Sequence, residues 1–417
     1  MALWLLILLY TLAFFSLYTQ VFFLLSYLEN RDIMKKQEQR RVADEDLPAV
    51  TMIVPCWNEE ASVYDSIQSI FDIDYPMDRF HVIAVDDGST DNTWQELQRF
   101  AGDARITLLQ KENGGKHSAL NFAIPHVTTP YMCCIDADTT FEPQSLRELV
   151  TYAVFEPEVA AVAGTVLIKK PSTIFQMAQN IEYQMFAFNK KVLGLLHGVL
   201  VAPGAFSLFK TQVVRAVGGY RQAHNMEDLE LTYRLQVHGH RVEHCHSGIA
   251  YTTGPRTLKA LFKQRMRWSY GFLHNTRDYK YAIFNKSYGS FGVFTLPMSL
   301  FAYVVVVVLF FLSWYYFINF FVDAITLIRL AGMSAFAGSL VNFDWFFINT
   351  QAFFFLSSLM VIIVVATILL GRKTSKLPML SHIGHVVWFF GLYNLLAPFW
   401  IMSSILNVIR SHQPSWR

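Results

Sequence analysis

Two pairs of aspartates stand in short stretches of otherwise small or apolar residues. The stretch "VDDGSTDNT" places Asp86 and Asp87 side by side, and "CIDADTTF" places Asp136 and Asp138 two residues apart. Residues two apart on an extended chain point to the same side, so the second pair can face one ligand. Such oxygen ligands suit Mg²⁺ or Mn²⁺ carrying a diphosphate, because these ions leave several positions to phosphate and water. Alone, the first pair is also consistent with a solvated turn.

A glycine-rich stretch, "ENGGKHSALN", resembles a phosphate-binding loop. A Walker A motif needs Gly-x-x-x-x-Gly-Lys-Ser/Thr, but Gln110 stands at the first glycine position and His117 at the hydroxyl position. These departures argue against an ATPase. What remains is a flexible pair of glycines, ending in Gly115, that presents Lys116 to an anion.

A third acidic stretch, "NMEDLELTYRL", opens an amphipathic helix with Glu227 and Asp228. Carboxylates in a first helical turn often do no more than interact favourably with the helix dipole. In "RVEHCHSG", His244 and His246 flank Cys245, but no fourth ligand follows at metal spacing, which argues against a zinc site.

The stretch "FKQRMRWSYG" places polar and aromatic groups just before the chain becomes apolar. On a helix, positions three and four apart share a face, so we expect Gln264, Arg267 and Trp268 to be neighbours and Met266 to point elsewhere. A guanidinium can bind a diphosphate with two hydrogen bonds, and an indole can stack under a sugar. The alternative is an interfacial helix with a Trp anchor and snorkelling arginines, Arg265 among them.

Short Val- and Ile-rich runs must position the acidic residues. Predicted strands cover residues 49–56, 80–87, 104–110 and 131–138, with helical patterns such as 60–71 between them. This alternation predicts a mostly parallel sheet, in which ligands bind beyond the carboxyl ends of the strands. Both aspartate pairs and Asn58 fall at such ends.

The composition divides the chain between a globular domain and a membrane. A hydrophobic share of 53% is too high for an ordinary soluble domain, and a charged share of 16% is too high for a bare membrane bundle. Apolar runs at 3–28, 293–322, 345–370 and 383–409 can each cross a bilayer, and the first is expected to be an uncleaved anchor.

Lysines and arginines predict the orientation of these spans. The basic segments "NRDIMKKQEQRR" and "GRKTSK" should lie in the cytoplasm of a multi-pass cell-membrane protein, together with the globular domain. The net charge of +2 and the lack of other basic tracts argue against nucleic-acid binding. Four cysteines in a reducing compartment are not expected to form disulfides.

Two amphipathic segments, at 172–196 and 256–268, are interpreted as interfacial helices, although a core helix would show a similar pattern. The predicted domains are listed here in order: residues 1–29 as a transmembrane helix, 30–255 as the globular domain, 256–292 as interfacial helices, and 293–417 as three transmembrane helices.

The ordered series "VPCWNE", "DDGS", "GGKHSALN", "DAD", "APGAF", "MED" and "QRMRW" resembles the membrane-bound processive glycosyltransferases of family 2. This group includes the poly-N-acetylglucosamine, chitin-oligosaccharide, hyaluronan and cellulose synthases, and the resemblance covers about residues 50 to 275. One span before the domain and three after it most resemble bacterial synthases of N-acetylglucosamine polymers. The family often has T-E-D or G-D-D where Met226 here precedes Glu227 and Asp228, so the motif says little about the acceptor.

The resemblance implies an α/β GT-A domain that inverts the anomeric carbon of a UDP-sugar, with Mg²⁺ or Mn²⁺ as cofactor. Asp228 would be the base, with Glu227, Gln264, Arg267 and Trp268 as the other catalytic residues. Asp138, together with Asp136, would hold the metal. The remaining donor-binding residues would be Pro55, Asn58, Glu59, Asp86, Asp87, Gly115, Lys116 and Arg265, with Asp136 reaching the ribose or a phosphate oxygen.

The expected reaction is elongation of a β-linked polysaccharide from UDP-N-acetylglucosamine and its passage across the membrane. The expected partners are the UDP-sugar, a growing polysaccharide or lipid acceptor, the bilayer, and a small accessory membrane protein. A single-addition transferase acting on a lipid-linked acceptor is the main alternative. A non-catalytic membrane scaffold is a more distant one, because every acidic position of the expected site is present.

Overall fold

The computed structural model describes residues 3–341, 352–374 and 384–410. The chain forms two compact units. One comprises Met1–Leu24 with Ser299–Ala366, and the other comprises Leu25–Met298 with Thr367–Arg417. The second unit contains every predicted site residue together with the last part of the chain. The domain boundaries expected from the sequence stay a prediction.

An eight-stranded mixed sheet organises the second unit, in the order β3-β2-β1-β4-β7-β6-β8-β5. Strands β3, β2, β1 and β4 are parallel, β7 is antiparallel to both of its neighbours, and β6 is parallel to β8. The strands are β1 Val50–Cys56, β2 Phe80–Asp87, β3 Ile106–Lys111, β4 Tyr131–Ile135, β5 Thr140–Phe141, β6 Val159–Ile168, β7 Phe206–Lys210 and β8 Arg241–Thr252. The four strands expected from the sequence are therefore confirmed as β1 to β4.

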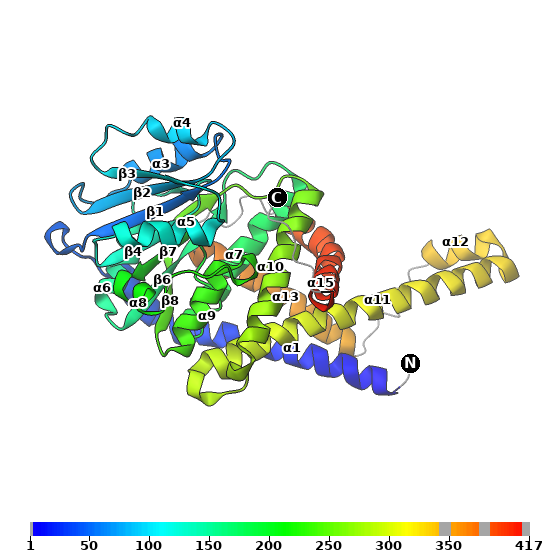
Figure 1. The fold of residues 1–417 in the computed structure, drawn as a ribbon. Helices are drawn as coiled ribbons and strands as arrows, with labels where there is room; N and C mark the ends of the chain where they lie inside the picture. The colour runs from blue at the N-terminus through cyan, green and yellow to red at the C-terminus, as the bar shows by residue number, and fades with distance from the viewer. Residues whose placement is uncertain (1–2, 342–351, 375–383, 411–417) are drawn as a thin grey trace. The chain divides into compact units, whose positions relative to one another are not determined.

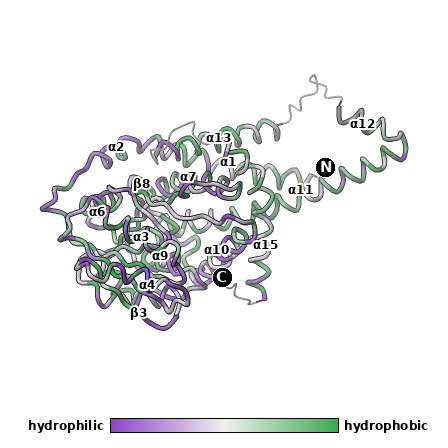
Figure 2. The backbone as a smooth tube through the Cα atoms, turned by 90° about the horizontal axis from the view of Figure 1, so that it is seen from above, coloured by the Kyte–Doolittle hydropathy of each residue, from purple (hydrophilic) through white to green (hydrophobic). Residues whose placement is uncertain are grey.

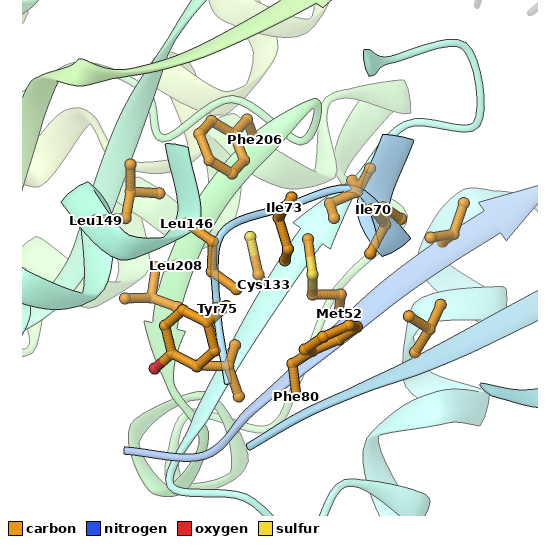
Figure 3. Close-up of a cluster of buried hydrophobic side chains, with 14 of the residues drawn as sticks. Met52, Ile70, Ile73, Tyr75, Phe80, Cys133, Leu146, Leu149, Phe206 and Leu208 are labelled. Atoms are coloured by element: carbon orange, nitrogen blue, oxygen red, sulfur yellow. The ribbon is translucent and has the colours of Figure 1, made fainter. Parts of the chain in front are cut away.

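Helices cover both faces of this sheet, as Figure 1 shows. Alternation along β1 sends Met52 to one face and Ile53 to the other. Met52 joins a buried cluster with residues such as Ile70 and Leu146 (Figure 3), and Ile53 joins a second cluster with Leu120. The covering helices are α3 Val63–Phe71, α4 Thr93–Gln98, α5 Lys116–Ala123, α6 Ser145–Phe155, α8 Thr211–Ala216 and α9 Glu227–Val237.

The two amphipathic segments form long helices, α7 Ile174–Leu195 and α10 Leu258–Asp278. Helix α7 begins with a capping box between Thr173 and Gln176, which satisfies backbone N–H groups at its start. It packs against β6 and β8 and against the segment 385–393, and even polar side chains such as Gln184 are buried. This packing is what the core-helix alternative predicts for α7.

Two helices in the described part of the chain, Ile7–Glu29 and Phe291–Ala331, are long and apolar enough to cross a membrane. The pair His385–Tyr393 and Leu395–Ile409, bent by 43°, would make a third. Figure 2 shows predominantly hydrophobic residues along α1 Leu3–Glu29 and α11 Leu296–Ala331. The predicted run 345–370 begins outside the described residues and continues into α13 Ala352–Thr374, so the count of four spans stays a prediction.

Candidate active site

The carboxyl ends of β2 and β4 bring both aspartate pairs to one edge of the sheet. Strands β2 and β4 pair with opposite sides of β1 in parallel, so their ends point the same way. Asp86 and Asp87 end β2, and Asp136 and Asp138 follow β4 directly. The predicted placement beyond the strand ends is thereby confirmed.

Asp87 holds the glycine-rich loop in place. Its carboxylate accepts hydrogen bonds from the backbone N–H groups of Gly114 at 3.1 Å and Gly115 at 2.8 Å. It also forms an ion pair with Lys111 at 2.7 Å. Gly115 has a φ of +86°, which favours glycine, and it leads directly into Lys116 at the start of α5. The buried Asp87 carboxylate therefore fixes the loop from which α5 begins at Lys116.

Asp86 and Asn58 organise the neighbouring loop at the end of β1. The Asp86 carboxylate accepts from Gln110 Nε2 at 2.9 Å and from the Ser89 N–H at 3.2 Å. Asn58, at a φ of 54°, accepts from the Thr90 N–H at 2.8 Å. Pro55 and Glu59 lie on the same strand end, but nothing in these contacts identifies a uridine, so that assignment stays a prediction.

Lys116 lies at the centre of the acidic groups. Its ammonium forms ion pairs with Asp136 and, at 3.4 Å, with Glu227. Burial would lower the pKa of Lys116, but the carboxylates of Asp136, Glu227 and Asp228 outweigh it and hold the pKa well above its usual range. Lys116 is therefore a permanent cation that joins the end of β4 to the start of α9.

Asp138, two residues after Asp136, is partly buried. Thr252 Oγ1 donates to both of its carboxylate oxygens at 3.2 Å. Burial, followed by the charges of Asp136 and Glu59, raises the pKa of Asp138 to about 7. A carboxyl group beside other negative charges favours a bound cation, because the cation compensates the repulsion. No group of three or more His, Cys, Asp or Glu side chains that could hold a metal ion occurs within the described ranges.

Asp228 is fixed at the start of α9 by two backbone N–H groups. Gly204 donates to its Oδ2 at 3.0 Å, and Leu229 donates to its Oδ1 at 2.8 Å. A Cβ at Gly204 would lie 2.5 Å from the Lys116 Nζ and 3.7 Å from Asp228 Oδ2. At Gly204, within "APGAF", a larger residue would therefore displace the Lys116 ammonium. The neighbouring Glu227 is buried, and this burial raises its pKa although Lys116 opposes the shift.

The segment that precedes Glu227 has an unusual backbone conformation. Ala223, His224 and Asn225 have φ values of 45°, 56° and 64°, a left-handed conformation that is unfavourable for residues with a Cβ. Helix α10 holds this segment: Arg267 Nη1 donates to the Asn225 carbonyl at 3.2 Å, and Asn275 Nδ2 donates to the Ala223 carbonyl at 3.1 Å. The helix that carries "QRMRW" therefore positions the two carboxylates.

The other residues of "QRMRW" lie in different surroundings. Arg265 is buried, forms an ion pair with Glu182 at 2.5 Å and lies over the Trp268 ring at 4.3 Å. Tyr393 also accepts from Arg265, at 3.2 Å. Met266 points elsewhere, as expected, and its sulfur lies 3.3 Å from Asn407 in α15 Asn394–Ile409.

Arg267 of this motif therefore contacts the segment that precedes Glu227, whereas Arg265 is buried in the interior. Gln264 Oε1 is buried and has no hydrogen-bond partner among the residues that the structure describes. The charge of Arg265 is paired with that of Glu182. None of these contacts tests whether Arg265 binds the donor, so that role stays a prediction.

Several contacting residues were not indicated by the sequence. Thr252 and Glu182 belong to segments with no recognisable motif, and only the folded chain brings them to Asp138 and Arg265. A signal existed for Gly204, because it stands inside the quoted stretch "APGAF".

The histidines and the cysteine of "RVEHCHSG" have other surroundings in the described part of the chain. His246 Nε2 lies at hydrogen-bond distance, 2.6 Å, from Glu38 Oε1, and His244 Nε2 lies 3.3 Å from Thr165 Oγ1. The four cysteines are buried and free.

Comparisons with known proteins agree with this geometry. Residues 48–271 match the family described as "Glycosyltransferase like family 2". The chain is 28% identical over 229 residues to a poly-beta-1,6-N-acetyl-D-glucosamine synthase of Staphylococcus aureus, covering 54% of this chain and 55% of the relative. The corresponding synthase of Staphylococcus epidermidis is 28% identical over 244 residues, covering 58% of each. The chain thus matches little more than half the length of these relatives.

A mannosyltransferase from Pyrobaculum calidifontis, solved with GDP-Man and Mn²⁺, aligns over 97% of this chain and 99% of its own. The TM-score is 0.58 and the identity is 17%, so this likeness concerns the fold alone. The family match covers more than half of the chain. The chain therefore belongs to glycosyltransferase family 2, and its sheet is that of a GT-A domain.

Proposed function

We propose that the chain is an inverting glycosyltransferase that uses UDP-N-acetylglucosamine to elongate a β-linked polysaccharide. The names of its curated relatives, poly-beta-1,6-N-acetyl-D-glucosamine synthases, support the choice of sugar and product. The observation that carries the proposal is the fixed Asp228 carboxylate beside Lys116, Asp136 and Glu227 at the strand ends.

Asp228 is the general base of the proposed reaction. Each of its oxygens accepts one backbone N–H, which fixes the carboxylate and leaves further lone pairs for an acceptor hydroxyl. The acceptor oxygen attacks the anomeric carbon from the face opposite the diphosphate. The new C–O bond forms, the bond from C1 to the phosphate oxygen breaks, and the hydroxyl proton passes to Asp228. UDP leaves with the electron pair of the broken bond.

Cations near the strand ends stabilise the leaving diphosphate. Lys116 and Arg267 flank the carboxylates of α9 and are the protein's candidates. Asp138, with Asp136, would hold Mg²⁺ or Mn²⁺, and the negative charge around Asp138 fits such a cation. When bound, the ion supplies positive charge to the departing phosphate groups. The presence of Mn²⁺ in the similar mannosyltransferase supports this choice.

The apolar helices anchor the protein in the cell membrane, with the catalytic domain on the cytoplasmic side. The growing chain then leaves through the membrane. A small accessory membrane protein would assist this export. The two or three candidate spans and the basic segments beside them support this arrangement.

A transfer assay tests the proposal. Purified protein in membranes is incubated with radiolabelled UDP-N-acetylglucosamine, UDP-glucose, UDP-glucuronate or GDP-mannose, singly and in pairs, and the product is sized and digested. We expect a polymer from UDP-N-acetylglucosamine alone. A lipid-linked product of a single size would support the single-addition alternative instead, and no turnover with any donor would support the scaffold alternative.

The same assay tests the base. Asp228→Asn should lower transfer by about 10²-fold or more, the contribution of a positioned general base, while UDP binding remains. Near-normal turnover of this variant would show that Asp228 is not the base.

A further inference from the structure

One side of α7 carries residues that are attached to α10, the helix with Trp268. Glu182, Phe186 and Asn189 lie four and three positions apart and therefore share this side, and Lys190 borders it. The ion pair between Glu182 and Arg265, at 2.5 Å, attaches this side of α7 to α10. Glu182 thus joins this side of α7 to the helix that carries Trp268.

Aromatic rings continue from α10 onto α7. Trp268 packs against a cluster that contains Tyr183, and the Tyr183 and Phe186 rings lie 6.2 Å apart. Phe186 is 39% exposed, whereas Tyr183 is buried. An exposed phenyl ring that continues a row of aromatic rings offers a flat apolar surface to a ligand.

Asn189 adds an unused hydrogen-bond acceptor. Its Oδ1 atom is buried and finds no hydrogen-bond partner in the part of the chain that the structure describes. A buried amide oxygen without a partner is unfavourable, and in native proteins such an atom calls for a specific explanation. A ligand hydroxyl group would provide the missing donor.

Lys190 adds a cationic side chain to this side of α7. It is partly buried and forms no ion pair within the described residues. Burial lowers its pKa to about 8, although the nearby Asp228 carboxylate raises it. The other titratable group that interacts with it is His244 on β8, whose own pKa is lowered by burial and by Lys190. The Lys190 ammonium is therefore available as a hydrogen-bond donor below about pH 8.

We propose that Phe186, Asn189 and Lys190 form the binding surface for the acceptor saccharide beside Asp228. A sugar ring has an apolar face of C–H groups and a rim of hydroxyls, which matches one exposed ring, one unpaired acceptor and one cationic donor. Phe186 stacks against the apolar face, Asn189 accepts from a hydroxyl, and Lys190 donates to a sugar oxygen. This assignment rests on the proposed function, because it concerns the acceptor of that reaction.

Kinetics with separate donor and acceptor test the surface. Phe186→Ala, Asn189→Ala and Lys190→Met are compared with wild type at varied N-acetylglucosamine oligosaccharide and saturating UDP-N-acetylglucosamine. We expect the acceptor KM to rise about tenfold or more, as for the loss of one specific contact of about 1.4 kcal/mol. The Kd for UDP should change less than twofold. Lys190→Arg, which keeps the charge, should recover part of the loss.

Lys259→Met is the matched control, because Lys259 is exposed in the first turn of α10 and the substitution removes the same charge. It should leave the acceptor KM unchanged. Wild-type acceptor KM in all three α7 variants would overturn the proposal, and so would an equal loss of UDP binding, which would place these residues at the donor.

Direct binding of the oligosaccharide separates this proposal from the proposed function. Saccharide binding by wild type that is lost in the three variants supports the surface even if no sugar is transferred. Transfer by wild type with unaltered variants refutes the surface and leaves the proposed function standing. Thermal unfolding of each variant shows whether it folds, and a variant that does not fold is replaced by a closer match in size that still removes the contact: Phe186→Leu, Asn189→Leu or Lys190→Gln.

Discussion

Gly271→Ala is expected to impair catalysis by displacing the carboxylates of α9 without touching a ligand. Gly271 lies in α10, where its Cα faces Met226, the residue immediately before Glu227. A Cβ at this position would lie 2.9 Å from the Met226 Cβ, 3.3 Å from the His224 carbonyl oxygen and closer still to the Met226 Cγ. The first two atoms belong to the backbone or are bonded to it, so a change of rotamer cannot remove the contact.

The size of the effect follows from these distances. Carbon atoms pack best at about 3.5 to 4.0 Å, so Met226 must shift by roughly 0.6 Å or more. Glu227 and Asp228 follow it directly and should move by a similar amount. A misplacement of about 1 Å at a reacting group can reduce the rate by about 10²-fold. We therefore expect the initial rate of transfer to fall between about 10- and 100-fold.

Stability should change less than activity. Alanine in a helix interior is favoured over glycine by about 1 kcal/mol, while overpacking typically costs about 1–3 kcal/mol. The two effects partly cancel, so the free energy of unfolding should fall by at most about 2 kcal/mol. Thermal unfolding and UDP binding are measured in parallel with transfer, and both should remain close to those of wild type.

A matched substitution and a second-site change complete the test. Gly102→Ala serves as the control, because no atom lies within 4 Å of the Cβ that it adds. Met226→Ala, combined with Gly271→Ala, removes the closest contact and should recover part of the rate. Transfer by Gly271→Ala within threefold of wild type would refute the claim that α10 positions the carboxylates. Loss of UDP binding would show that the disturbance reaches the donor site instead.

Three further outcomes are expected. Arg267→Lys should lower transfer by about tenfold or more at equal membrane expression. An ammonium cannot reproduce the geometry with which a guanidinium can bind both the Asn225 carbonyl and a diphosphate. A mild effect would favour the membrane-anchor alternative. Asp138→Asn should weaken Mg²⁺- or Mn²⁺-dependent UDP binding by about tenfold, measured by titration with and without chelator, and equal affinity in both conditions would remove Asp138 from the metal site. Lys190 has a pKa lowered to about 8, so its positive charge is present below that pH and lost above it. The acceptor KM should therefore rise above pH 8 in wild type but not in Lys190→Arg, and identical pH profiles would contradict the role of this charge.

Periodicity and composition were sufficient to predict the first half of the sheet. Strands β1 and β2 are rich in Val and Ile, and polar residues stand at or just after their ends. Parallel strands place these ends at one edge of the sheet, whichever residues the strands contact elsewhere in the fold. The later strands β5 to β8 were not predicted individually. One of them, β5, contains only Thr140–Phe141, too short for any alternation to be recognised.

Amphipathicity could not decide the environment of α7. A helix in a membrane interface and a helix between a sheet and other helices both need one apolar face. The folded chain also covers polar positions, since Gln184 accepts from Arg372 at 3.2 Å and Asn180 lies 3.3 Å from His385 Nδ1. These partners come from the end of the chain, and no local pattern connects them with α7.

The sequence by itself determined which residue types are available and which strand ends and helix starts carry them. It placed Asp86, Asp136 and Asp228 correctly at such ends, because hydrophobic periodicity and capping are local properties of the chain. Only the tertiary structure decided how these groups are paired. Gly204, just before β7, donates to Asp228 at the start of α9, and Arg265 in α10 is paired with Glu182 in α7, although each pair is distant in sequence. Such contacts depend on the relative positions of whole elements, which arise from burial of apolar surface that is not specific to any one pair of residues.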